Sequence, residues 1–118
     1  MGDLNTLSPQ DEYDQNKLLL SLRHKNIKKF GIKQLQIKVI PRLLEAGFTD
    51  TLKHYSNNLE PTIPTSLNSD KDHVIPLRLD YIFVSKNLLP FLSHAEIIKR
   101  EQTDQVSDHF PIFAELKL

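Results

Sequence analysis

A regular alternation of side chains between residues 77 and 85 constrains the fold more than any other feature of this sequence. Every second residue from Leu77 to Phe83 is apolar or aromatic, and Arg78, Asp80, Ile82 and Val84 form the opposite face. This period of two predicts a β-strand over 77–85. Residues 111–118 alternate in the same way and predict a second strand.

We expect these two strands to lie in one sheet that carries the core of the protein, since each has one apolar face. On this hypothesis the most buried residues include the following four: Tyr81, Phe83, Ile112 and Leu116.

The remaining segments predict a mixture of helices, short strands and loops. Ser8 and Pro9 are typical of a helix start, and leucines at helical spacing favour a helix through about Arg23. A second short helix is expected over 40–47, with Pro41 in its first turn and Gly47 after its end. Three further segments follow from composition: a basic loop over 26–34, a loop over 57–76 with an extended piece at 62–65, and a strand over 95–100. The fold class predicted is α/β (α+β), with a mixed, largely antiparallel sheet.

Length and composition exclude several classes of protein. The chain has 118 residues, of which 39% are hydrophobic and 25% charged, as in an ordinary single domain. No run approaches the roughly 20 apolar residues of a membrane span. Cysteine is absent, which excludes disulfides and thiolate metal sites. The first residues show neither a basic nor an apolar signal region, so a cytoplasmic location is the default expectation.

The charges are unevenly distributed, although the formal net charge is zero. The segment 17–44 contains lysines and arginines but no acidic residue, whereas the segments on both sides are acidic. Two readings are open: a solvated face balanced by neighbouring acids, or contact with a polyanion such as nucleic acid through phosphates. The residues assigned to the second reading are Lys25, Lys28, Lys29 and Lys33.

Asp80 is unusual because it shares a strand face with Ile82 and Val84. A carboxylate that points into a protein interior costs several kcal/mol (roughly) unless it is paired or binds a ligand. The alternatives are an edge position that reaches solvent, or an ion pair with Arg78. We predict instead that Asp80 hydrogen-bonds to His109 and fixes the tautomer of that imidazole.

Two further polar pairs are candidates for chemistry. Asp108 and His109 precede the strand at 111–118, where a histidine can bind phosphate, ligate a metal or transfer a proton, or simply be solvated. Asp3 and Asn5 lie two residues apart in a turn and together suit the positioning of a water molecule against a phosphate. The other histidines have no matching carboxylate and are predicted to be surface residues: His24, His54, His73 and His94.

These pairs occur in an order that resembles a known family. Gly2-Asp3-Leu4-Asn5, Arg78-Leu79-Asp80-Tyr81-Ile82-Phe83 and Ser107-Asp108-His109-Phe110-Pro111-Ile112 are similar to the last three motifs of the endonuclease/exonuclease/phosphatase superfamily. Residues 46–50 and 62–65 also fall where many members carry similar residues. The resemblance covers the chain from Gly2 to Leu118.

The resemblance implies a four-layer α/β sandwich and hydrolysis of phosphate esters with Mg²⁺ or Mn²⁺. By this resemblance Asp3 orients or deprotonates the attacking water, and Asn5 holds that water or a phosphoryl oxygen. His109 stabilises charge on the phosphoryl group, Asp80 fixes its ring, and Asp108 helps to hold the metal, with Asp3 and Asn5 as further ligands. This division of labour agrees with phosphoryl transfer, which depends on positioning and charge neutralisation.

Complete members of that superfamily carry a first half that contains the principal metal-binding Glu, for which this sequence has no counterpart. We therefore expect the C-terminal half of the domain, with an exposed apolar sheet face and weak activity alone. Asp3 and Asn5 are expected on a frayed terminus unless another element anchors them. The expected partners are a phosphate-ester substrate and either a second copy of the chain or a complementary N-terminal half. The alternative functions are a non-catalytic interaction module and a basic nucleic-acid binder.

Overall fold

The computed structural model describes all residues from Met1 to Leu118 and shows helices combined with small antiparallel sheets. The longer elements are β1 (Gly2–Asp3), α1 (Gln15–His24), α2 (Val39–Glu45), β2 (Phe48–Asp50), α3 (Thr51–Tyr55), β3 (Asp80–Tyr81), β4 (Phe83–Ser85), β5 (Leu92–Ile97) and β6 (Ile112–Leu116). Short 3₁₀ turns occupy Pro9–Asp11, Lys71–His73, Leu89–Phe91 and Thr103–Gln105. The predicted α+β class is confirmed. None of the helices is both long and apolar enough to span a bilayer.

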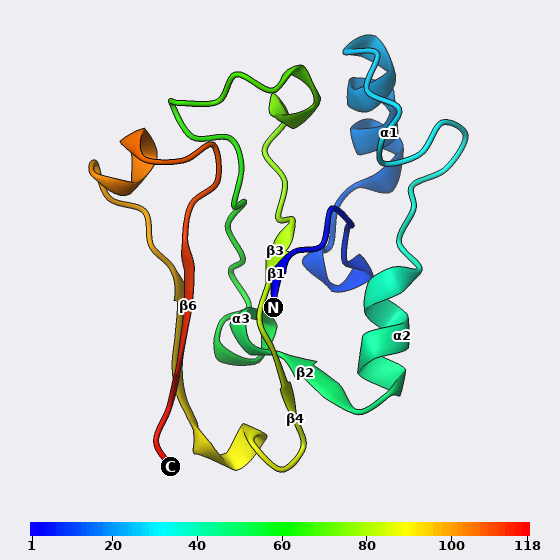
Figure 1. Ribbon diagram of the computed structural model, residues 1–118. Helices are drawn as coiled ribbons and strands as arrows, with labels where there is room; N and C mark the ends of the chain where they lie inside the picture. The colour runs from blue at the N-terminus through cyan, green and yellow to red at the C-terminus, as the bar shows by residue number, and fades with distance from the viewer.

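The strands form three antiparallel pairs, β1 with β3, β2 with β4 and β5 with β6. Figure 1 shows β3 and β4 in the middle, the β5–β6 ribbon along one side and both longer helices on the other. The prediction that segments 77–85 and 111–118 share a sheet is therefore wrong. β6 pairs only with β5, a strand that begins three residues earlier than expected, at Leu92.

The predicted strand over 77–85 is present only in part: its first three residues lie outside any strand, and the rest is divided at Ile82 into β3 and β4. The Ile82 carbonyl accepts from both the backbone N–H and the hydroxyl of Thr51, each at 3.0 Å. The chain therefore pairs with β1 before Ile82 and with β2 after it. The short elements β2 and α3, which the sequence analysis did not predict as structure, provide this second partner.

Both predicted helices are present. Ser8 caps the 3₁₀ turn that begins at Pro9, and Glu12 then adopts a left-handed conformation, so that α1 begins only at Gln15, capped by the Asp14 carboxylate. The α2 helix ends before Gly47, which has a φ of +90°. The expected extended piece at 62–65 is represented by a single bridge between Ile63 and Leu77.

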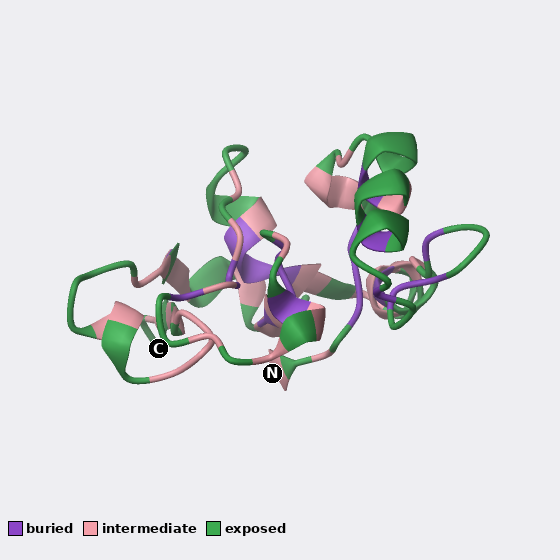
Figure 2. Cartoon of the chain, turned by 90° about the horizontal axis from the view of Figure 1, so that it is seen from above, coloured by how far each residue is buried: buried purple, intermediate pink, exposed green.

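The hydrophobic core lies between α1, the following loop and the segment before β3, rather than on β6. Its members are fully or nearly fully buried: Leu7, Leu18, Leu22, Ile27, Phe30, Leu35, Ile63, Leu77 and Leu79. Of the four residues predicted to be most buried, only Tyr81 is; Phe83, Ile112 and Leu116 are half-buried. Figure 2 shows the buried residues concentrated in the middle and on the inner side of α1. The molecule is thin, with extents of 46 × 35 × 20 Å.

A charged cluster joins the core to β2. Arg78, whose side chain is 1% exposed, donates from Nε and Nη2 to both carboxylate oxygens of Asp11 and from Nη2 to Asp50. Burial alone lowers the pKa of Arg78, but the hydrogen bonds to the two carboxylates outweigh burial and raise the pKa above its ordinary value. The alternative that Arg78 neutralises Asp80 is therefore wrong.

Candidate active site

Pairing of β1 with β3 brings the first two carboxylates of the site together. Asp3 lies directly opposite Asp80 in the antiparallel register, and the Leu4 amide continues the pairing by donating to the Leu79 carbonyl at 3.0 Å. The two strands are far apart in the sequence, since β1 is at the N-terminus and β3 begins at Asp80. β3 is therefore the element that anchors the segment around Asp3, which without such a partner was expected to fray.

Asp3 and Asn5 form a local turn that faces solvent. The Asp3 carboxylate accepts from the backbone N–H of Asn5 at 2.8 Å and from its side-chain amide at 2.9 Å. Asn5 has a φ of +49°, a left-handed conformation that asparagine tolerates better than most residues. Both side chains are exposed, so the free lone pairs of Asp3 remain accessible to water, metal or substrate.

The predicted pairing of Asp80 with His109 is confirmed. His109 donates from Nδ1 to the Asp80 carboxylate at 2.8 Å. The His109 side chain is 17% exposed and that of Asp80 is 13% exposed, so both are largely shielded while still reaching the surface. Because the carboxylate holds the proton on Nδ1, the other ring nitrogen, Nε2, is available to a ligand or to a reacting group.

The loop that carries Asp108 and His109 is fixed by the segment 62–65. Thr65 donates from its hydroxyl to the Ser107 carbonyl at 2.5 Å, and Phe110 donates its amide to the Thr62 carbonyl at 2.8 Å. Within the loop, Ser107 donates to an Asp108 carboxylate oxygen at 3.3 Å and accepts from the His109 amide at 3.2 Å. Through these contacts the segment 62–65 holds the loop in place and orients His109 toward β3.

His73 is a site residue that the sequence analysis assigned wrongly to the surface. It is 4% exposed, and its ring lies edge-on to that of His109 with 5.2 Å between the ring centroids. The nearby Asp70 caps the turn by accepting from the Asp72 amide, and this hydrogen bond lowers the pKa of Asp70. No local sequence signal marks His73 as buried, because its sequence neighbours are polar and the residues that shield it from solvent are distant in the sequence.

Of the four lysines assigned to polyanion contact, only one reaches this site. Lys29 Nζ lies 2.8 Å from Nε2 of His73. Lys25, Lys28 and Lys33 are exposed and form no ion pair, in agreement with either a solvated face or a free anion-binding face.

The donor set fits a hard divalent cation in part. One ligand atom each from Asp3, Asp80 and His109 lies within 4.8 Å of the others. Carboxylate oxygens are the donors that Mg²⁺ and Mn²⁺ prefer, and Mg²⁺ commonly uses only one or two protein carboxylates with several waters. Asp108 belongs to a different group of ligand atoms, which includes His109 but neither Asp3 nor Asp80.

Comparison of the chain with protein-family models, with curated proteins and with solved structures produced no match.

Proposed function

We propose that this protein hydrolyses phosphate esters with the help of a divalent metal ion, Mg²⁺ or Mn²⁺. The observation that carries the proposal is the His109–Asp80 hydrogen bond of 2.8 Å, with the Asp3 carboxylate in the same group of ligand atoms. A carboxylate-oriented imidazole beside an accessible acid is the arrangement that acid–base and electrostatic assistance to phosphoryl transfer requires.

The residues divide the work according to their hydrogen bonds. Asp80 holds the proton on Nδ1 of His109, so that Nε2 faces the substrate and, when protonated, donates to a phosphoryl oxygen. Asp3 accepts a hydrogen bond from the attacking water, and its turn with Asn5 keeps the carboxylate in position. Asn5 contributes its remaining amide hydrogen or carbonyl oxygen to the same water or to the phosphate.

Asp3 would hold the metal ion, with the neighbouring Asn5 side chain offering a further oxygen donor. When bound, the ion supplies neutralisation of charge on the phosphoryl oxygens and on the leaving group. Only Asp3 among the carboxylates of the site is both exposed and free of an ionic partner, since Asp80 is already engaged by His109. We therefore expect weak metal binding and slow turnover by the 118-residue chain.

Hydrolysis of small chromogenic phosphate esters tests this function. The assay follows nitrophenolate release from bis(p-nitrophenyl) phosphate and p-nitrophenyl phosphate in Mg²⁺ or Mn²⁺, with EDTA as the blank. We expect metal-dependent turnover that falls about 100-fold or more in His109→Ala and in Asp3→Asn. His54→Gln and Glu101→Gln remove an exposed imidazole and an exposed carboxylate elsewhere, and both variants are expected to match the wild-type protein. Equal rates in His109→Ala and the wild-type protein would refute the proposal.

The exposed lysines favour a polyanionic substrate, such as nucleic acid, for this hydrolysis. Lys25, Lys28 and Lys33 provide positive charge without acidic partners, and phosphates require no particular geometry to bind them. In DNA-binding titrations at several salt concentrations, replacing all three by Gln should reduce the slope of log K against log salt by about two to three. An unchanged slope would assign these lysines to a solvated surface.

A second candidate function is a non-catalytic module that associates with another copy of the chain. The favouring observation is that all three sheets have only two strands and that large apolar side chains are exposed beside them, namely Phe48, Phe91 and Phe113. Sedimentation equilibrium distinguishes the two candidates: a dimer that Phe113→Ser dissociates, without metal-dependent hydrolysis, supports the module.

A further inference from the structure

His73 has a buried ring nitrogen without a partner. Its side chain is 6% exposed, Nε2 is contacted by Lys29 at 2.8 Å, and Nδ1 has no hydrogen bond. The nearest acid, Asp70, lies 3.4 Å from Nδ1 without forming a hydrogen bond. An unsatisfied buried polar atom costs about 1–3 kcal/mol, so its presence calls for a ligand or a functional reason.

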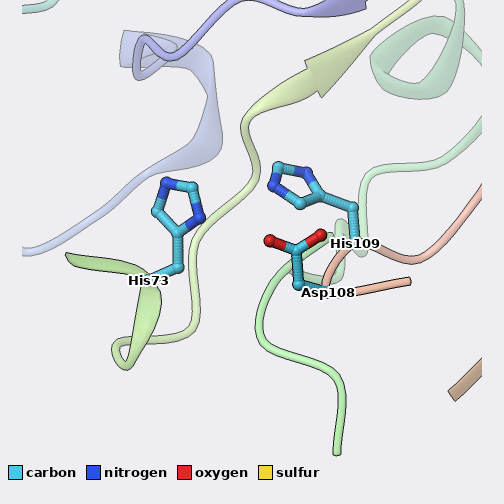
Figure 3. A group of neighbouring side chains, drawn as sticks. All are labelled: His73, Asp108 and His109. Carbon is cyan, nitrogen blue, oxygen red and sulfur yellow. The ribbon is translucent and has the colours of Figure 1, made fainter. Parts of the chain in front are cut away.

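The unpartnered nitrogen shares its surroundings with two other donors. Figure 3 shows the side chains of His73, Asp108 and His109 turned toward one common space, although they come from two distant segments. One ligand atom from each lies within 4.8 Å of the others. In a tetrahedral site with bonds of about 2.1 Å, ligand atoms lie roughly 3.4 Å apart, so a shift of about 1 Å closes this group around an ion.

The groups behind these donors are those that support metal ligands. His109 gives its Nδ1 proton to Asp80, which leaves a lone pair on Nε2, and a metal-bound histidine usually has such a carboxylate at its other nitrogen. Ser107 donates to an Asp108 carboxylate oxygen at 3.3 Å and restrains that side chain. Two imidazoles and one carboxylate are the donors of sites that bind zinc with a fourth position left open.

We propose that His73, Asp108 and His109 bind a divalent transition-metal ion, with Zn²⁺ as the best-fitting ion. The site goes beyond the proposed phosphoesterase centre, because its donors are mainly nitrogen and it excludes Asp3. It shares His109 with that centre, so an ion bound here occupies the Nε2 that would otherwise face a phosphate.

Lys29 competes with this ion. An ammonium group can only donate, so its contact with Nε2 keeps the proton of His73 on Nδ1, the nitrogen that the metal needs. Lys29 is exposed and free to swing away, after which the proton moves to Nε2 and Nδ1 becomes a ligand. The positive charge also repels a cation. Removing this charge therefore strengthens metal binding, whereas it would weaken the binding of an anion in the same space.

Calorimetric titration of the untagged full chain with ZnCl₂, without substrate, tests the proposal. We expect one ion per chain, at least about tenfold weaker binding in His73→Gln, and several-fold tighter binding in Lys29→Met. His54→Gln, which removes an exposed imidazole, should bind as the wild-type protein does. Circular dichroism confirms folding of each variant, and Lys29→Met decides the question if His73→Gln does not fold.

Wild-type Zn²⁺ affinity in a folded His73→Gln variant would overturn the proposal, as would weaker or unchanged Zn²⁺ binding in Lys29→Met. A parallel titration with inorganic phosphate identifies the competing explanation: loss of phosphate binding in both variants, with Zn²⁺ binding unaffected, makes the space an anion site and refutes the metal site. Because no ester is present, failure of hydrolysis does not affect this result.

Discussion

Arg78 and Asp50 form an ion pair of 2.6 Å in which each side chain is only 1% exposed. Asp50 also caps α3, by accepting from the Leu52 amide at 3.2 Å. This pair therefore connects the segment before β3 with α3, the helix that follows β2. Breaking it leaves a charge in the interior, and such changes have large energetic effects.

Replacing Arg78 by Met should lower the free energy of unfolding by about 3–5 kcal/mol, because Asp11 and Asp50 are then buried without a cation. Arg78→Lys should recover only part of this loss, since an ammonium cannot reproduce the two-pronged contact with Asp11. Urea unfolding measures both. Arg100→Met, at an exposed arginine, is the control and should stay within about 0.5 kcal/mol of the wild-type protein.

Asp80→Asn should reduce the rate constant of ester hydrolysis about 100-fold or more while leaving the protein folded. The neutral asparagine amide can donate its N–H to Nδ1, which favours the other tautomer of His109, and it supplies no negative charge to stabilise the protonated imidazole. When two residues act as a unit, the effects of replacing them on the rate are not additive. The double variant Asp80→Asn/His109→Ala should therefore be little slower than His109→Ala alone. If the fold-reduction in rate of the double variant equals the product of the two single reductions, the two residues act separately.

Alkaline pH should destabilise the protein partly through Tyr81. Burial raises the pKa of this phenol, whose hydroxyl donates to the Thr6 and Arg78 carbonyls, so the folded state keeps its proton to higher pH than the unfolded state does. The Tyr81 phenol contributes fully to the free energy of unfolding below about pH 10, the ordinary pKa of tyrosine. Above that pH the contribution falls by up to about 1.4 kcal/mol per pH unit.

Urea unfolding between pH 8 and 11 should therefore show a shallower alkaline decline in Tyr81→Phe than in the wild-type protein. Burial also raises the pKa of Tyr13, so the double variant with Tyr13→Phe should be shallower still. An identical decline in Tyr81→Phe and wild type would assign alkaline unfolding to other groups.

Gly31→Ala should destabilise the protein by roughly 1–3 kcal/mol more than Gly47→Ala. Both glycines have positive φ values, +123° and +90°, which impose a similar backbone cost on alanine. An added Cβ at Gly31 would lie 2.0 Å from the Gln34 carbonyl oxygen, whereas at Gly47 its nearest neighbour is the Lys86 side chain at 3.5 Å. Thermal unfolding of the two variants side by side measures the difference; equal losses would show that the loop adjusts freely.

The sequence indicated the Asp80–His109 pair because an inward carboxylate on a strand requires a partner, and the motif order supplied the histidine. It could not indicate the sheet arrangement, since the break depends on a hydrogen bond between Ile82 and Thr51, 31 positions away. His73 was missed for a similar reason. Its burial comes from tertiary packing and its contact with Lys29 spans 44 positions, while its own segment is polar and resembles an exposed loop.

The shortness of β1 has a consequence for how often the site is assembled. Thr6 to Ser8, which follow β1, are buried, whereas Gly2 and Asp3 are held to β3 mainly by a two-residue pairing and by the Leu4 amide. Such a pair opens locally without global unfolding. Each opening carries Asp3 away from His109, so hydrogen exchange at the Leu4 amide reports the fraction of time during which these two side chains lie apart.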